Sequence, residues 1–93
     1  MKLLNWNVWY KEDIKAIAKV IAGQDVDVAC LQEMTVGYKY NEGLDTPKYL
    51  AQELGFDYFF VASQKAMEGN CEWVYGNAIL SREKINNRKR VFL

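Results

Sequence analysis

Three successive hydrophobic patterns occupy the first part of the chain. Residues 2–9 alternate between two faces, as the residues of a strand do. Within residues 11–23, apolar side chains recur at the spacing of an amphipathic helix; they are Ile14, Ile17, Ala18 and Ile21. Residues 26–33 contain a continuous apolar run, Val28 to Leu31, which is typical of a strand buried in a sheet. The pattern predicts a strand, a helix and a second strand.

These three elements have the order and the length of a βαβ unit, in which the two strands lie parallel in one sheet. We expect Trp6 to pack in the core and Cys30 to lie in the buried run of the second strand. Acidic Glu12 and Asp13 should open the helix, and Gly23 should cap its C-terminal end. The pattern therefore indicates an α/β fold.

A second helix follows a loop that contains glycine and tyrosine. Thr46 can cap this helix with Pro47 at its first position, and Gly55 ends it. Its apolar residues Leu50, Ala51 and Leu54 should face the core.

The remaining residues predict further strands. Residues 56–63 are rich in aromatic and β-branched side chains, which favours a third strand, and residues 64–72 read as a loop. Residues 73–81 predict a fourth strand, in which Gly76 marks a bulge or the close approach of another group. Residues 85–93 have the pattern of a fifth strand.

Composition and charge narrow the class of protein. The 93 residues are 51% hydrophobic and 26% charged, which fits at most one globular domain. Twelve basic and twelve acidic residues cancel, so no overall field attracts nucleic acid or a membrane. Cys30 and Cys71 are too few for a disulfide scaffold, which favours a reduced, cytoplasmic setting. The sequence has neither a signal-peptide core nor a long apolar stretch, so it predicts no export and no membrane span.

Polar residues stand where the first two strands end. Asn7 and Glu33 lie near the carboxyl ends of parallel strands, so they should point toward one edge of the sheet. One carboxylate with carbonyl-type oxygens suits Mg²⁺, which keeps several waters and takes few protein ligands. The sequence therefore predicts a metal-assisted phosphate site. A solvated acid at a strand end is the alternative for Glu33 taken alone.

Three motifs follow one another in a set order along the chain. They are WNV at residues 6–8, DVDVACLQE at residues 25–33 and GNAILS at residues 76–81. Together they resemble the endonuclease/exonuclease/phosphatase superfamily, which includes deoxyribonuclease-like enzymes, over essentially the whole chain. The resemblance implies a four-layered α/β sandwich. It also implies a phosphohydrolase that uses Mg²⁺, or Mn²⁺ in its place, on DNA, RNA or a small phosphodiester or phosphomonoester.

The resemblance also implies roles for single residues. By position, Glu33 corresponds to the metal-binding glutamate of that family, and Asn7 corresponds to its active-site asparagine close to the metal and the phosphate. Both residues are expected to hold the metal and to act in catalysis. Cys30 and Gln32 are interpreted as packing and local hydrogen bonding. Asn77 is interpreted as an ordinary strand position outside the site.

The sequence departs from the family in its later motifs. It contains neither a Gly-Asp-x-Asn segment nor a Ser-Asp-His segment, and it has no histidine. Residues 1–93 therefore correspond to the N-terminal portion of an incomplete domain whose second sheet is missing. We expect the missing C-terminal half, or self-association, to cover the exposed sheet face. The chain alone should be inactive and poorly soluble or self-associating.

Two other interpretations remain open at this level. A non-catalytic module could bind nucleic acid through the basic C-terminal stretch, with Arg82, Arg88, Lys89 and Arg90 contacting phosphates. Alternatively, a freestanding α/β domain could carry Asn7 and Glu33 without any role for them.

Overall fold

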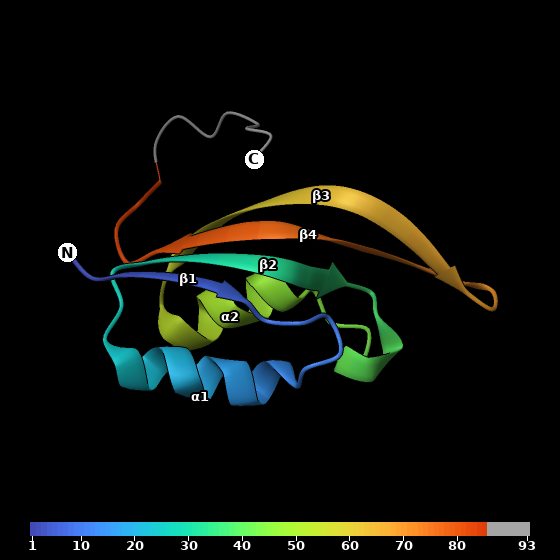
Figure 1. The fold of residues 1–93 in the computed structure, drawn as a ribbon, viewed down its shortest axis with the longest axis horizontal. Coiled ribbons are helices and arrows are strands. Elements are labelled where there is room, and N and C mark those ends of the chain that lie inside the picture. Colours follow the sequence, from blue (N-terminus) through green and yellow to red (C-terminus); the bar gives the residue numbers. More distant parts are fainter. Residues whose placement is uncertain (86–93) are drawn as a thin grey trace.

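A computed structural model describes residues 1–85, apart from the side chain of Glu68. These residues form a mixed β-sheet with helices on one face. In chain order the elements are β1 (Leu3–Asn7), α1 (Ile14–Gln24), β2 (Val28–Val36), the 3₁₀ helix η1 (Lys39–Asn41), α2 (Thr46–Leu54), β3 (Asp57–Glu68) and β4 (Cys71–Ser81). Figure 1 shows α1 and α2 side by side beneath the sheet. The predicted α/β class is thus confirmed for the described part of the chain.

The sheet has four strands in the order β1-β2-β4-β3. β1 and β2 are parallel, from Leu3 opposite Val28 to Asn7 opposite Gln32. β4 pairs antiparallel with both β2 and β3. The predicted βαβ unit is therefore present, and it brings the carboxyl ends of β1 and β2 to the same edge.

The hydrophobic core lies between the sheet and the helices. Its sheet side includes Ala29, Leu31 and Leu80, which are fully buried, and its helix side includes the predicted stripe of α1. Each buried leucine contributes roughly 1.5–3 kcal/mol through its removal from water. Trp6 packs against this core, as predicted. The side chains on this face of the sheet thereby hold the helices against it.

The opposite face of the sheet is open over the residues that the structure describes (Figure 1). It carries Leu3 and Ile79, which are exposed by 68% and 38%. Cys30 also lies on this side and is only half-buried, so the prediction of a buried Cys30 was wrong. The continuous apolar run of β2 suggested two covered faces, whereas Ala29 and Leu31 alone face the helices.

Several element boundaries differ from the prediction because side chains and strand pairing override local pattern. α1 continues through Gly23 and ends at Asp25, which adopts the left-handed conformation at the C-cap. Asp13 precedes the helix and caps it by accepting a hydrogen bond from the Lys15 N–H. Asp45, not Thr46, caps α2, whereas Gly55 ends that helix as predicted. The helix boundaries thus depend on which residue has the capping conformation or hydrogen bond, and a nearby glycine alone does not set them.

Thr46 has another role. Its Oγ1 accepts from the Thr35 N–H at 3.0 Å and donates to the Thr35 carbonyl at 2.7 Å. Both residues are 1% exposed. Thr46 therefore attaches the start of α2 to the second half of β2, which explains why its hydroxyl does not cap the helix.

The β3–β4 hairpin is longer than its sequence suggests. Residues predicted as a loop at 64–72 continue both strands and leave only Gly69 and Asn70 between them. Cross-strand hydrogen bonds fix this polar segment, although its local pattern does not favour a strand. Of the predicted fifth strand at 85–93, residues 86–93 lie outside the described part of the chain.

Gly76 lies where the hairpin bends. The pairing of β3 with β4 shifts between Ala62 and Gln64, directly opposite Gly76. A Cβ added there would overlap the Val61 carbonyl oxygen and lie 2.8 Å from both the Ala62 Cα and the Ser63 N. The predicted bulge and close approach are both confirmed.

Candidate functional site at the carboxyl edge of the sheet

Asn7 and Glu33 lie at neighbouring places on β1 and β2. Asn7 pairs with Gln32, and Glu33 is the next residue of β2. β2 does not end there, however, because it continues to Val36 and pairs with β4 beyond the end of β1. The structure therefore brings the two predicted site residues to the same edge of the β1–β2 pair, with Glu33 at a bulge instead of a strand end.

This bulge decides which face receives Glu33. Leu31 pairs with Ala78 and Met34 pairs with Gly76, so β2 has one more residue than β4 over this interval. Leu31 and Met34 both pack in the core beside the helices. Strict alternation would put Glu33 on the same side as Leu31, inside the core. The extra residue removes the carboxylate from that interior, where an unpaired charge would be costly.

Glu33 has an unusual backbone and no partner within residues 1–85. Its φ is +60°, in the left-handed region that non-glycine residues rarely adopt. Its side chain is half-buried, and none of the described residues forms a hydrogen bond or ion pair with its carboxylate. Strain of this kind costs about 1–3 kcal/mol and is concentrated at functional sites. A bent strand thus presents an acid that has no partner among residues 1–85.

The side chain of Asn7 is oriented by the backbone that follows it. Its Oδ1 accepts a hydrogen bond from the Trp9 N–H at 3.1 Å. The side-chain oxygen thus already accepts a backbone hydrogen bond, while the Nδ2 group of this exposed residue can still donate. Trp9 itself has a φ of +64°. A residue other than glycine with a positive φ therefore follows β1, at Trp9, and another interrupts β2, at Glu33.

A row of amide side chains crosses the sheet beside Glu33. The Gln32 Nε2 donates to the Asn5 Oδ1 at 2.8 Å, which agrees with the local role predicted for Gln32. Asn77 lies between Ala78 and Gly76 on β4, directly opposite the bulge. The sequence analysis left Asn77 outside the site. The signal that could have included it was Gly76, whose predicted bulge fixes the register at this point.

Aromatic rings collect at the same edge. They are Trp9, Tyr10, Tyr38, Tyr40, Trp73 and Tyr75, joined by ring contacts with centroid separations of 4.1–6.4 Å. They come from the segments after β1 and β2 and from β4. No local sequence pattern predicts this group, because its members are spread over almost 70 residues.

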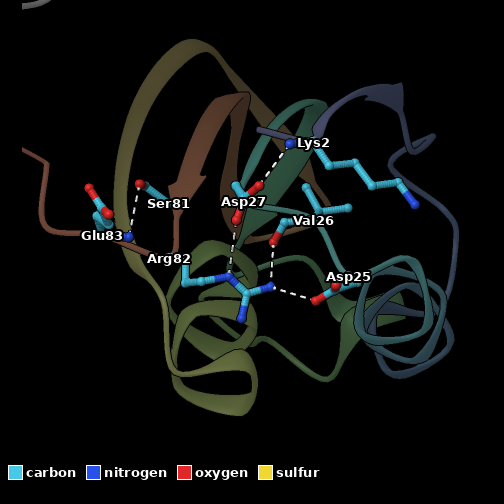
Figure 2. Close-up of polar contacts among 7 residues, drawn as sticks. All are labelled: Lys2, Asp25, Val26, Asp27, Ser81, Arg82 and Glu83. Atoms are coloured by element: carbon cyan, nitrogen blue, oxygen red, sulfur yellow. Dashed lines mark hydrogen bonds and ion pairs between the residues drawn. The ribbon is translucent and has the colours of Figure 1, made fainter.

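The opposite end of the sheet has a different chemistry. Figure 2 shows the Arg82 guanidinium between the ends of β2 and β4, where its Nη2 donates to the Asp25 Oδ1 at 3.0 Å and to the Val26 carbonyl at 2.9 Å. Its Nε lies 3.4 Å from the Asp27 Oδ1. The Asp27 Oδ2 accepts from the Lys2 N–H at 2.7 Å. Arg82 is thus engaged within the fold.

Those contacts set the pKa of Asp27. The hydrogen bond from the Lys2 backbone holds the pKa of Asp27 below its ordinary value of 3.8, and the Arg82 charge acts in the same direction against partial desolvation. The engagement of Arg82 also weakens the interpretation of a basic phosphate-binding stretch. The other residues of that stretch, Arg88, Lys89 and Arg90, lie outside the described residues.

A surface hollow of about 240 Å³ lies at the start of α1 and is lined in part by Tyr40 of the aromatic group. There the Asn41 Oδ1 accepts from the Ile14 N–H at 3.0 Å, and its Nδ2 donates to the Glu12 carbonyl at 3.2 Å. The chain itself thus satisfies polar groups at this helix end. The polar groups of this helix end need no ligand, so Asn7 and Glu33 on β1 and β2 are the better candidates for a phosphate site.

A metal ion could bind at this edge through a single carboxylate, with water as its other ligands. Within residues 1–85, no group of three or more histidine, cysteine, aspartate and glutamate side chains could enclose an ion. Mg²⁺, however, is commonly bound through one or two carboxylates and several waters. The Glu33 carboxylate, which has no partner among residues 1–85, fits that smaller share of a site, whereas the Oδ1 of Asn7, the other predicted ligand, already accepts from the Trp9 N–H.

The comparison with protein families is decisive at this point. The model of the endonuclease/exonuclease/phosphatase family matches residues 4–92. The chain belongs to this family. The family resemblance carried by the WNV, LQE and GNAILS motifs is thereby confirmed. The family typically uses divalent metals and acts on phosphoesters.

A solved structure agrees with the fold. An endonuclease/exonuclease/phosphatase family protein from Leptotrichia buccalis C-1013-b matches with a TM-score of 0.59 and 23% sequence identity. The match covers 94% of this chain and 39% of that protein, so the chain spans well under half of that family member. A search of curated proteins gave no match. Among residues 1–85, no helix is long and apolar enough to cross a membrane.

Proposed function

We propose that these residues form the N-terminal part of a metal-dependent phosphoric ester hydrolase, with Asn7 and Glu33 in its active site. The observation that carries the proposal is the Glu33 carboxylate, which has no partner in the described part of the chain and is held at φ +60° beside the register position of Asn7. Membership of the family adds independent support. Substrates of this class include DNA, RNA and small phosphodiesters or phosphomonoesters.

The roles of the two residues follow from their available atoms. Glu33 would hold Mg²⁺, or Mn²⁺ in its place, through its carboxylate. When bound, such a cation neutralises charge that develops on the phosphate and on the leaving oxygen. Asn7 would donate from Nδ2 to a phosphate oxygen, because its Oδ1 already accepts from the Trp9 N–H. The pair thus positions the phosphate group.

The proton transfers require groups that these residues do not supply. The sequence contains no histidine, and Glu33 is assigned to the cation. We place the remaining catalytic groups in the part of the domain that this chain does not span. That part would also pack on the open face of the sheet and complete a four-layered sandwich. The chain alone should therefore bind a cation without turning over phosphodiesters.

Calorimetric titration with Mg²⁺ in the absence of substrate tests the proposal. Wild-type protein should show one binding event, and Glu33→Gln should remove it. Glu42→Gln is the matched control, because Glu42 also has a positive φ, +58°, but pairs with Lys15 at 3.5 Å. Equal Mg²⁺ binding by wild-type protein and Glu33→Gln would contradict the assignment, and so would binding that depends on Glu42.

A further inference from the structure

The inner rings of the aromatic group form a fixed base. Tyr38 and Trp73 are 3% and 9% exposed, and their ring centroids lie 4.1 Å apart. Tyr10 stacks on Trp73 with an interplanar angle of 23°. These contacts join the segments after β1 and β2 to the hairpin. The inner rings therefore have a structural role that needs no ligand.

The two outer rings do not share this burial. Trp9 is 53% exposed and Tyr40 is 60% exposed, although each contacts an inner tyrosine edge-on, at 6.4 Å and 5.2 Å. Large apolar groups that collect on a surface are typical of an interaction site. Their exposure distinguishes them from Tyr38 and Trp73.

The backbone of Trp9 supplies a second observation. A bulky residue with φ +64° is a strained outlier, and glycine or asparagine would suit this conformation better. The hydrogen bond from its N–H to the Asn7 Oδ1 fixes the turn. The indole is thus held, at a cost in conformational energy, two residues from the proposed phosphate-binding amide.

Positive charge accompanies the rings. The Lys11 Nζ lies 5.8 Å from the centre of the Tyr10 ring, and the Lys39 Nζ lies 5.3 Å from that of Tyr40. Aromatic rings combined with basic side chains are the means by which proteins bind single-stranded nucleic acid, since bases stack on the rings and phosphates meet the charges.

We propose that Trp9 and Tyr40 form a stacking site for the unpaired bases of a single-stranded nucleic acid, beside the phosphate site of Asn7 and Glu33. Lys11 and Lys39 contact the adjoining phosphates. This inference rests on the proposed function for the nature of the substrate, and it assigns that substrate to nucleic acid. Its binding contacts, however, need no metal and no turnover.

Binding in EDTA tests the stacking site separately from catalysis. Fluorescence anisotropy compares a labelled oligothymidylate of about ten nucleotides with an abasic oligomer that carries the same number of phosphates. Wild-type protein should bind the oligothymidylate more tightly, since each stacked base contributes about 1–3 kcal/mol, or roughly 5- to 150-fold in affinity. Tyr40→Leu and Trp9→Leu should each reduce this preference at least about five-fold.

Matched variants separate stacking from folding. Tyr40→Phe keeps the ring and should keep the preference, while Val20→Ala alters an apolar residue that is 46% exposed on α1 and should change nothing. Equal binding of both oligomers, binding of neither, or a preference that survives both leucine variants would overturn the stacking site. Base preference without Glu33-dependent Mg²⁺ binding would instead leave the stacking site intact and reject the metal assignment.

Discussion

The two ends of the β1–β2 pair are built from similar residues and have opposite chemistry. At the amino end, Asp25 and Asp27 are both paired with Arg82, and Asp27 also accepts from the Lys2 backbone. At the carboxyl end, Glu33 has no partner within residues 1–85 and sits on a left-handed backbone. One end satisfies its charges within the fold, and the other leaves a charge available.

The amino end of the sheet contributes to stability, whereas the carboxyl end carries strain. The Arg82 contacts join β4 to the start of β2, and the guanidinium also lies 5.4 Å from the centre of the Phe56 ring. The strained backbone at Trp9 and Glu33 lowers stability instead. Asp25 and Glu42 also have a positive φ, but each forms an ion pair, whereas Glu33 has no partner among residues 1–85.

Loss of the bulge geometry should have the largest effect. Gly76→Ala puts a Cβ against the backbone of Val61 and Ala62, so the hairpin must shift. We expect the free energy of unfolding to fall by about 3 kcal/mol. Gly23→Ala is the control, because nothing lies within 4 Å of its added Cβ, and it should stabilise α1 by about 0.5–1 kcal/mol. Urea denaturation of both variants measures the difference; a Gly76→Ala protein of wild-type stability would contradict the described register.

Removal of the paired end should have the next largest effect. Arg82→Ala breaks the hydrogen bond to the Val26 carbonyl and the contacts with both aspartates. Because the guanidinium is half-exposed, we expect a loss of about 2 kcal/mol in urea denaturation. Mg²⁺ affinity should be unchanged in the folded protein. Loss of Mg²⁺ binding without loss of stability would reverse the roles assigned to the two ends.

The strained end should respond in the other direction. Glu33→Gly releases the left-handed backbone from its side chain, so the free energy of unfolding should rise by about 1 kcal/mol while Mg²⁺ binding is lost. Thermal unfolding and calorimetry on the same preparation measure both quantities. A destabilised Glu33→Gly protein would show that the carboxylate contributes to the fold after all.

The smallest expected effect concerns pH. Because the pKa of Asp27 in the folded protein lies below its ordinary value of 3.8, its contribution to stability is complete above that pH and is lost as the pH falls toward the folded pKa. Denaturation midpoints should therefore decline below about pH 4. Asp27→Asn should be less stable at neutral pH and should show a shallower decline. Identical slopes for both proteins would contradict this assignment.

Much of this architecture could be predicted from the sequence. The alternation around Trp6 and the stripe of α1 specify the βαβ unit, since burial of one face determines both patterns. Gly76 indicated a bulge because no other residue fits there. The edge that holds Asn7 and Glu33 followed from the parallel order of β1 and β2.

Other features depended on tertiary structure. The length of β3 and β4 arises from pairing between polar segments that have no strand pattern of their own. Asn77 reaches the site through a one-residue shift in register, which a periodic pattern does not encode. The aromatic group and the Arg82 contacts join residues far apart in the chain. In each case the partner, not the local sequence, determines the role.

The most direct test asks which end of the sheet receives a divalent cation. Paramagnetic Mn²⁺, added at low stoichiometry to ¹⁵N-labelled protein, broadens the NMR signals of nearby groups. The account predicts selective loss of the Asn7 side-chain amide and of the backbone signals of Glu33 and Asn77, with recovery in Glu33→Gln and no recovery in Glu42→Gln. Broadening centred on Asp25 and Asp27 instead, unchanged in Glu33→Gln, would contradict it.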